Sequence, residues 1–513
     1  MRKLKNISFC FFLLLLFVSF AHAEPVELRI LHVNDFHGFV EPYKPLGSEE
    51  LLGGIAYLAG RANELRRERP SLLLSAGDMI QGDNWANLFQ AESVIELMNV
   101  MRFDAMVLGN HEFDSGQEIL KKRVSEARFP VLGANVKGLA YVRPYIIEEL
   151  GGIRLAIIGV VTEDVPASTH PRNVTGLKFL SSVETVGKYV EELRNKVDVI
   201  IVLSHIGYPA DRVLAERVKG IDVVVGGHSH TKITKPVTIG NTLVAQAWEH
   251  GKALGVLDLT VKDGKVIGSE GHLEEIKPEK GKEDKAALAV VNKYKEKVDG
   301  RLNVRIGEAG VDLDGENVRR RETNFGDFIA DVMRSLSGAD AAIINGGGIR
   351  VSIRKGEIRA KDIYSALPFD NYIVAIQLTG RQIKEALEHG VSGIENEEGR
   401  FPQVSGLTFR YSPSAKRGSR VKKISIAGKP IYSDRTYIVA TNDFMAVGGD
   451  GYKAFGEAIK SSKDFSVTGG MMKGEKIVYS DSSRWLRDVV AEYIREKKEI
   501  APEVEARIIE IRK

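Results

Sequence analysis

Residues 105–114, "AMVLGNHEFD", place a polar motif directly after an apolar run. A short apolar run bounded by turn-forming residues is typical of a strand buried in a parallel sheet. The arrangement recurs along the first half of the chain, where other apolar runs end in "DFH" at Asp35, "GD" at Asp78, "SH" at His205 and "GGHSH" at His228. Because the strands of a layered α/β fold end at one rim, we expect these polar residues to meet there.

Helical patterns alternate with these strands. Residues 54–68 and 182–196 carry apolar side chains at spacings of three and four, as an amphipathic helix does. A charged stretch around Pro278 leads into another amphipathic helix, which we interpret as a connector over residues 276–303. The sequence therefore predicts a leader at 1–23, an α/β domain at 24–275 and a second α/β region at 304–513.

The leader has the three parts of a secretory signal peptide. Basic residues at the start are followed by an apolar run over residues 9–20 and by the small-residue sequence "AHA", with cleavage expected after Ala23. The alternative is a membrane anchor, but the run is shorter than the roughly 20 residues that a spanning helix needs. Cys10, the only cysteine, lies in this leader, so the mature chain is expected to contain no disulfide. We expect a periplasmic or secreted protein without a membrane or lipid anchor.

Size and charge narrow the class of protein. A chain of 513 residues with 43% hydrophobic content can form large cores, roughly two to four domains. The formal net charge is +3 and falls to about zero without the basic residues of the leader. The absence of a basic field argues against long nucleic acid as a partner.

The recurring polar motifs supply ligands for divalent metal ions. Asp, His and Asn offer the oxygen and nitrogen donors that such ions prefer. Asp35 and His37 stand two apart, as His228 and His230 do, so in an extended segment the side chains of each pair point the same way. The carboxylate of Asp78, with its two oxygens, can bridge two ions. Each residue alone could be a turn residue or a helix cap, but their joint occurrence at strand ends predicts a two-metal site. The predicted ligands are Asp35, His37, Asp78, Asn110, His205, His228 and His230.

His111 is the residue that we expect to meet the substrate. Asp114 follows it by three residues, a spacing at which a carboxylate can orient an imidazole within one helical turn. Such an imidazole could stabilise charge on a transferring phosphoryl group or protonate the leaving oxygen. The alternative is that His111 is a further metal ligand. His32, which lies inside an apolar run, is interpreted as a core or supporting residue.

The segments "ILHVNDFHG" and "FDAMVLGNHEFD" resemble the signatures of the 5′-nucleotidase family within the calcineurin-like metallophosphoesterases. The resemblance implies a four-layer α/β/β/α metallophosphoesterase domain, a helical connector and a C-terminal α/β substrate-binding domain. It also implies that His111 and Asp114 form the catalytic dyad. One ion would be held by Asp35, His37, Asp78 and His230, and the other by Asp78, Asn110, His205 and His228. Because the position of His230 varies in the family, the metal is left open between Zn, Mn, Co and Mg.

The same resemblance assigns substrate-binding roles in the second half of the chain. Arg319 in "VRRRETN" would bind the phosphate, with Arg320 and Arg321 as the alternatives or a solvated charge run as the structural interpretation. Asn345 and Arg350 of "IINGGGIR" would contact the nucleoside and the phosphate. The resemblance implies that Phe401 and Phe444 stack on the two faces of the base. It also implies that Asp450 accepts hydrogen bonds from the ribose hydroxyls, although Asp450 could instead be a turn residue.

The implied activity is that of an exported hydrolase acting on phosphoric ester bonds. A metal-bound water would remove the terminal phosphate of AMP and other nucleoside 5′-phosphates, with UDP-sugars as further substrates and with domain closure around the connector. The alternatives are a 2′,3′-cyclic-nucleotide phosphodiesterase/3′-nucleotidase or NAD nucleotidase of the family, a related sulfur-compound hydrolase, and a non-catalytic nucleotide-binding protein. Tyrosines in place of the two phenylalanines would favour the cyclic-nucleotide activity, and a broken ligand set would favour a binding protein.

Overall fold

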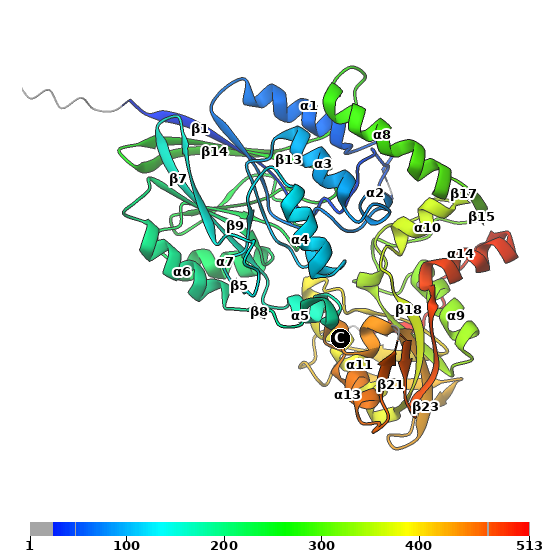
Figure 1. Ribbon diagram of the computed structural model, residues 1–513. Helices are drawn as coiled ribbons and strands as arrows, with labels where there is room; N and C mark the ends of the chain where they lie inside the picture. Colours follow the sequence, from blue (N-terminus) through cyan, green and yellow to red (C-terminus); the bar gives the residue numbers. More distant parts are fainter. Residues whose placement is uncertain (1–23, 47, 469–470, 512–513) are drawn as a thin grey trace, which may run out of the picture.

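The computed structural model describes residues 24–46, 48–468 and 471–511. The predicted leader, residues 1–23, lies outside the described residues. Figure 1 shows two α/β domains, one formed by the blue to green part of the chain and one by the yellow to red part. Within the described ranges, no helix combines the length and the apolar character that crossing a bilayer requires.

Two six-stranded sheets form the centre of the N-terminal domain, in the orders β14-β13-β1-β2-β3-β4 and β11-β12-β10-β9-β7-β6. Strands β1 to β4 run parallel to one another, and so do β7, β9, β10 and β12. The carboxyl ends of these parallel strands therefore meet at one rim. The strands of the first sheet are β1 (Val26–Val33), β2 (Ser71–Ser75), β3 (Ala105–Val107), β4 (Val131–Leu132), β13 (Ala253–Lys262) and β14 (Lys265–Glu275). Those of the second are β6 (Tyr145–Leu150), β7 (Ile153–Val161), β9 (Val199–His205), β10 (Val223–Gly226), β11 (Val237–Ile239) and β12 (Thr242–Gln246).

The central strands of both sheets are apolar on both faces. In β1, Leu28 and Ile30 pack between the sheets, whereas Leu31 and Val33 face the helices outside. This alternation follows from the two-residue period of a strand. Helices α1 (Ile55–Arg66) and α3 (Glu92–Met101) cover the first sheet, and α6 (Ser182–Leu193) and α7 (Tyr208–Arg217) cover the second. The predicted four-layer α/β/β/α arrangement is confirmed.

The helix predicted as the connector is α8 (Lys285–Leu302). Asp284 caps its start by accepting hydrogen bonds from the backbone N–H of Ala286 and Ala287, at 3.0 and 2.9 Å. Tyr294 and Val291 are buried in the core that α1 and α3 share. Figure 1 shows α8 running along the N-terminal domain toward β15 (Arg305–Ala309) and β17 (Gly356–Arg359). Most of the connector helix therefore packs on the N-terminal domain, whereas its last residue, Leu302, is buried in the C-terminal core.

A five-stranded sheet in the order β19-β16-β23-β18-β26 forms the centre of the C-terminal domain. Its strands are β16 (Ala341–Asn345), β18 (Tyr372–Thr379), β19 (Pro402–Ser405), β23 (Thr436–Asn442) and β26 (Ile477–Trp485). Helices α9 (Asn324–Ser337) and α14 (Leu486–Lys497) share one core with it, and α11 (Gly380–Gly390) and α13 (Lys453–Lys460) share another. Three smaller sheets complete the described part of the domain. One contains β20 (Leu407–Tyr411), β21 (Val421–Ile426), β22 (Lys429–Pro430) and β28 (Ile508–Glu510), another contains β15, β17 and β27 (Glu499–Ile500), and the last pairs β24 (Ser466–Thr468) with β25 (Met471–Lys473).

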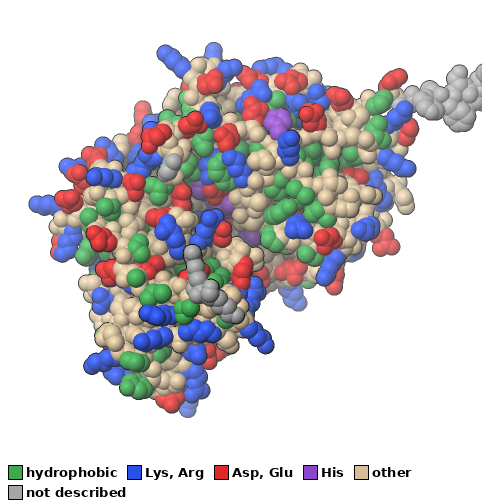
Figure 2. Space-filling model, turned by 180° about the vertical axis from the view of Figure 1, so that it is seen from behind, with side chains coloured by type: hydrophobic (Ala, Val, Ile, Leu, Met, Phe, Trp, Pro, Cys, Tyr) green, Lys and Arg blue, Asp and Glu red, His purple; other side chains and the backbone are tan. Residues whose placement is uncertain are grey.

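The two domains contact each other through α2 (Asn84–Asn87) and α10 (Ala360–Ala366). Asn84 Nδ2 donates to Ser365 Oγ at 2.8 Å, and Ser365 Oγ donates to Asp83 Oδ2 at 2.5 Å. Asn87 Nδ2 donates to the carbonyl oxygen of Pro368 at 2.9 Å. A cavity of about 1910 Å³ between the domains is lined by residues of both. On the face shown in Figure 2, histidine side chains lie in the hollowed middle with Lys and Arg side chains beside them.

Candidate active site

The structure brings the seven predicted metal ligands together at the rim where the parallel strands end. They stand in the loops after β1, β2, β3 and β10 and at the last residue of β9. Their positions are Asp35 and His37, Asp78, Asn110, His228 and His230, and His205, in that order of strands. The expectation that residues distant in the sequence meet at one rim is thus confirmed in geometry.

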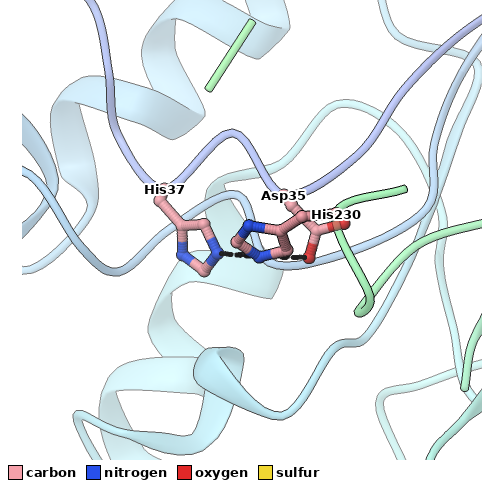
Figure 3. A group of neighbouring side chains, drawn as sticks. All are labelled: Asp35, His37 and His230. Atoms are coloured by element: carbon pink, nitrogen blue, oxygen red, sulfur yellow. Dashed lines mark hydrogen bonds and ion pairs between the residues drawn. The ribbon is translucent and has the colours of Figure 1, made fainter. Parts of the chain in front are cut away.

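The ligands form two groups whose donor atoms lie within 4.8 Å of one another. The first group is Asp35, His37 and His230, shown in Figure 3, where the three side chains point toward one another from two loops. His230 Nε2 lies 3.4 Å from Asp35 Oδ1 and 3.3 Å from His37 Nε2. The second group is Asp78, His205 and His228. Two clusters of donors, each large enough for an ion, are therefore present.

Asp78 lies between the two groups. Its Oδ2 is 3.1 Å from His205 Nε2 and 3.9 Å from His37 Nε2. Asn110 Oδ1 is buried and has no hydrogen-bond partner among the described residues. Leaving a buried polar atom unsatisfied costs about 1–3 kcal/mol, whereas a cation would satisfy this oxygen. The donor set therefore fits two divalent ions that share Asp78.

Most of the ligands have a left-handed backbone. The φ angles are 50° for Asp35, 50° for His37, 55° for Asp78, 75° for His228 and 53° for His230. Non-glycine residues rarely adopt positive φ, and such strained residues cluster at functional sites. The loops hold these side chains in place at the expense of local backbone stability.

Burial and charge set the protonation of the ligands. Burial lowers the pKa of His37 well below its ordinary value and that of His228 to about 3, so both imidazoles are neutral at neutral pH. Burial alone would raise the pKa of Asp78, but neighbouring histidines, His205 foremost, hold it well below its usual range. Burial would lower the pKa of His205, yet Asp78 raises it to about 10. An ion held by both groups would displace that proton.

Glu112 holds the ligand loops together, a role that the sequence analysis did not assign. Its buried carboxylate accepts hydrogen bonds from the backbone N–H of Asp78 at 2.9 Å, Met79 at 2.8 Å and Gly109 at 2.5 Å. Burial, and then the charge of Asp78, raises the pKa of Glu112 to about 7. The position of Glu112 inside the motif "GNHEFD" is the sequence feature that could have indicated this role.

Glu249 supports the first group from outside. Its Oε2 is hydrogen-bonded to His230 Nδ1, and its Oε1 accepts from Lys252 Nζ at 2.6 Å. Glu249 and His250 form a third group with His230, but the buried ammonium of Lys252 already neutralises the carboxylate. We therefore assign Glu249 to orienting His230. No sequence motif marked it.

The predicted dyad is formed in a short 3-10 helix, η1 (His111–Phe113). His111 Nδ1 and Asp114 Oδ2 are 2.6 Å apart, and both residues line the cavity. The backbone N–H of His111 donates to Asp78 Oδ1 at 2.9 Å, which places the dyad beside the metal ligands. His111 belongs to neither group of candidate ligands found in the described residues. The geometry favours the dyad over a further ligand.

Two arginines of the C-terminal domain face the metal groups. Arg350, after η3 (Gly346–Gly348), donates from Nη2 to His37 Nε2 at 3.1 Å. Burial, and then the charge of Arg319, lowers the pKa of Arg350 to about 10. Arg319 also lines the cavity and makes no hydrogen bond or ion pair in the part of the chain that the structure describes. Two adjacent guanidinium groups without a carboxylate partner form a site for an anion.

The alternative arginines are engaged elsewhere. Arg320 forms an ion pair with Glu397 at 2.7 Å, and Arg321 forms one with Asp314 at 2.9 Å. Their side chains are largely exposed, at 58% and 62%. Of the three neighbours, Arg319 is therefore the one placed to bind phosphate.

Asn345 and Asp450 lie side by side in the cavity wall. Asn345 Nδ2 donates to Asp450 Oδ2 at 2.5 Å, and Asn442 Nδ2 donates to Asn345 Oδ1 at 3.0 Å. Asp450 stands in η5 (Gly449–Gly451), and burial raises the pKa of its carboxyl. Phe444 of α12 (Asp443–Ala446) is half-buried and lines the same cavity.

Phe401, which was predicted to form half of a base clamp, does not line the cavity in this structure. Its side chain is fully buried in the C-terminal core, 6.2 Å from Tyr411 between ring centroids. Phe401 directly precedes β19, and its carbonyl oxygen accepts from the N–H of Gly346 at 2.7 Å. This pairing fixes the backbone against β16, and the side chain is part of the hydrophobic core.

Phe369 occupies the cavity instead. It is half-buried, its ring centroid lies 5.6 Å from that of His111, and the guanidinium carbon of Arg350 is 6.0 Å from the ring. Phe369 was not among the predicted site residues, although "LPFDN" places it between Pro368 and Asp370, in a segment typical of a loop. Phe369 and Phe444 are therefore the phenylalanines that line the cavity.

Comparison with known proteins agrees with this architecture. The model of the calcineurin-like phosphoesterases matches residues 28–232, and that of the 5′-nucleotidase C-terminal domain matches residues 300–457. Residues 233–299, which contain β11 to β14 and most of α8, lie between the two matches.

Full-length relatives match both domains. Human 5′-nucleotidase is 33% identical over 94% of this chain and 90% of its own length. The trifunctional nucleotide phosphoesterase YfkN of Bacillus subtilis is 34% identical, and the chain spans 35% of its length. The crystal structure of a 5′-nucleotidase precursor from Thermus thermophilus superposes with a TM-score of 0.86, at 34% identity over 95% of this chain and 100% of that one. The chain therefore belongs to the 5′-nucleotidase family, as a phosphoesterase hydrolase with a metallophosphoesterase domain ahead of a 5′-nucleotidase C-terminal domain.

Proposed function

We propose that the protein removes the terminal phosphate of nucleoside 5′-phosphates such as AMP. The observation that carries this proposal is the contact between Arg350 of the C-terminal domain and His37 of the candidate metal group, at 3.1 Å. It brings an anion site of one domain to the metal ligands of the other. A phosphate bound there would leave its nucleoside within the same cavity.

The nucleoside would lie along the C-terminal wall. The faces of Phe369 and Phe444 offer stacking surfaces, each worth about 1–3 kcal/mol for a base. Stacking is tolerant of base identity, which supports broad nucleotide specificity. Asp450 would accept hydrogen bonds from ribose hydroxyls, and Asn345 would contact the nucleoside.

The bound ions, for which the donors suit Zn, Mn, Co or Mg, would supply Lewis-acid chemistry: they activate water and neutralise phosphoryl charge. Arg319 and Arg350 hold the phosphoryl oxygens and add fixed positive charge. Nδ1 of His111 is hydrogen-bonded to Asp114, so Nε2 is the nitrogen available to the substrate. In the reaction, water adds to phosphorus, the bond from phosphorus to the ribose oxygen breaks, and that oxygen takes a proton. His111 is the residue placed to donate it.

A second class of substrate is supported by the size of the cavity. Its volume of about 1910 Å³ exceeds the roughly 300–1,000 Å³ of ordinary small-molecule sites. We propose that phosphoanhydrides such as UDP-sugars are accommodated as well.

Export is also a proposal. The basic start, the apolar run and the "AHA" sequence of residues 1–23 support cleavage after Ala23 and a periplasmic or secreted protein. Determining the N-terminal residue of the protein recovered from outside the cytoplasm tests this. A protein that retains residues 1–23 inside the cell would contradict it.

Phosphate release from AMP, UDP-glucose and 2′,3′-cyclic AMP tests the proposed activity. We expect metal-dependent release from AMP by the wild type and a loss of at least about 100-fold in His111→Ala, in line with the usual contribution of a general acid. Release from cyclic AMP alone would favour the cyclic-nucleotide activity. No release from any of the three, with metal bound, would favour a nucleotide-binding protein.

A further inference from the structure

One segment of the N-terminal domain contacts both the dyad and the nucleoside side of the cavity. We define this bridging segment as residues 164–174, which contain α5 (Val165–Ser168) and η2 (Pro171–Val174). It follows β7, and none of the functions assigned above uses it. Thr169 and His170 lie between its two short helices, and the exposed fraction of Thr169 is 2%.

Thr169 binds the second oxygen of the dyad carboxylate. Its Oγ1 donates to Asp114 Oδ1 at 2.5 Å, while Asp114 Oδ2 is 2.6 Å from His111 Nδ1. Asn173 Nδ2 donates to the backbone carbonyl of Asp114 at 2.7 Å. Both oxygens of the carboxylate and its backbone are therefore held, which fixes the plane of the carboxylate and the direction in which it meets His111.

Thr169 is itself firmly placed. Its backbone N–H donates to the carbonyl of Val165 at 3.0 Å, which closes α5. Gln117 Nε2 donates to the carbonyl of Asn173 at 3.2 Å, which ties the far end of the segment to the helix α4 (Gln117–Glu126) that follows Asp114. A hydroxyl held in this way can restrict a carboxylate without touching the substrate.

The other side of the bridging segment faces the C-terminal domain. Helix α5 contacts η5, the turn that carries Asp450. His170 Nε2 lies 4.0 Å from Asp443 Oδ2 in α12. Figure 1 shows α5 at the boundary between the two domains. The segment therefore connects the dyad with η5 and α12, which carry Asp450 and Phe444.

We propose that Thr169 is a positioning residue that extends the dyad to a triad of Thr169, Asp114 and His111. Its hydroxyl holds Asp114 so that Asp114 holds the His111 ring, with Nε2 directed to the leaving oxygen. This inference rests on the proposed function, because it assumes that His111 acts on a phosphate ester. A hydrogen bond to a carboxylate is stronger than one between neutral groups. Loss of the Thr169 hydroxyl should therefore loosen the orientation of Asp114.

Removing the hydroxyl alone should slow turnover without weakening substrate binding. Thr169→Val keeps the size of the side chain and deletes the donor. We expect kcat to fall about tenfold, the effect of losing one charge-assisted hydrogen bond, while KM changes less than about twofold. The fall should be the same for AMP and for p-nitrophenyl phosphate, because Thr169 acts through His111 and not on the nucleoside.

Three further variants separate positioning from structure. Thr169→Ser restores the donor and should recover most of the wild-type kcat. Thr169→Val in an Asp114→Ala background should add nothing to the loss caused by Asp114→Ala, because the hydroxyl then has no carboxylate to hold. Thr175→Val is the matched control, since the hydroxyl of Thr175 is exposed and donates only to backbone carbonyls, to that of Arg172 at 3.1 Å. It should behave as the wild type.

The experiment measures kcat and KM for both substrates, with metal content and thermal unfolding recorded for each variant. Thr169→Ala replaces Thr169→Val if the latter does not fold. An unchanged kcat in Thr169→Val, a failure of Thr169→Ser to recover it, or a full additional loss in the double variant would each overturn the inference and leave the proposed function standing. A wild type that releases no phosphate from either substrate would overturn the proposed function, and this inference with it.

Discussion

The two halves of the site differ in how their side chains are held. In the N-terminal half, Asp35, His37 and Asp78 are at most 1% exposed, and all three have positive φ. In the C-terminal half, Arg350 and Phe444 are only half-buried and line a wide cavity. In the N-terminal half, backbone conformation and burial therefore fix the positions of the side chains. In the C-terminal half, the side chains line a cavity and are less restricted.

This contrast predicts different responses to substitution. A pre-organised group of ligands tolerates little change in the loops that hold it, because interiors are close-packed. Side chains along a cavity contribute separately, so their loss should produce graded effects. Four substitutions test this contrast.

The largest effect is expected at Gly109. A Cβ atom on this residue would lie 2.2 Å from Asp78 Oδ1, so Gly109→Ala must displace the proposed bridging carboxylate. We expect loss of bound metal and a fall in phosphate release of at least about 100-fold, as for a ligand misplaced by 1 Å.

Gly187→Ala is the matched control, because no heavy atom lies within 4 Å of its added Cβ. Metal content measured by mass spectrometry, beside the AMP assay, compares the two variants. Normal metal content in Gly109→Ala would show that the N-terminal half is less rigid than we infer.

Glu249→Ala should weaken metal binding about 10- to 100-fold, the usual effect of removing a carboxylate that orients a ligating histidine. The reason is its hydrogen bond to His230 Nδ1, which fixes the imidazole. Competition with a chelator gives the affinity directly. Glu275→Ala, which removes a carboxylate paired with Lys232 at 2.6 Å, should leave the affinity unchanged. Equal affinities in both variants would argue that His230 needs no external support.

Replacing His32 tests the effect of burial in the N-terminal domain on a histidine that is not a predicted metal ligand. Burial lowers the pKa of this core histidine to about 4, whereas the unfolded chain titrates near its ordinary value of 6.5. The folded state therefore loses stability as the pH falls from 6.5 toward 4. Relative to His32→Leu, the wild type should lose about 2 kcal/mol of unfolding free energy between pH 7 and pH 5. Urea unfolding of both proteins, stripped of metal, measures the difference. A constant difference would show that His32 is not buried in neutral form.

The smallest effect is expected in the C-terminal half. Phe369→Leu removes an aromatic face from the cavity and should lower kcat/KM for AMP about tenfold, with little change for p-nitrophenyl phosphate, which has no base. Phe401→Leu makes the same substitution in the core and should leave kcat/KM unchanged. The reverse result would restore Phe401 to the base site and remove Phe369 from it.

The N-terminal half was largely predictable from the sequence. Ligands such as Asp35 and His205 directly follow or end apolar strands, and parallel strands bring such residues to one rim. Supporting residues were not predictable in the same way. Glu249 and Thr169 act through contacts between segments far apart in the chain, and their neighbours in the sequence carry no motif.

The C-terminal half was predicted less well for a physical reason. A phenylalanine in a glycine-rich loop can face either a core or a cavity, and local sequence does not decide which. Phe401 and Phe369 each adjoin a proline in the sequence, but the hydrogen bond between the Phe401 carbonyl and Gly346 fixes the backbone beside a core that contains the Phe401 side chain. The family resemblance favoured Arg319 over Arg320, and the structure adds the carboxylate of Glu397 that pairs with Arg320.

The number of ions needed for activity tests the central claim most directly. Metal-stripped protein would be titrated with manganese or zinc while phosphate release from AMP and the bound metal per chain are measured together. Our account predicts that release rises until two ions are bound per chain, because Asp78 lies between two groups of ligands. Full release from the stripped protein, or saturation at one ion per chain, would contradict it.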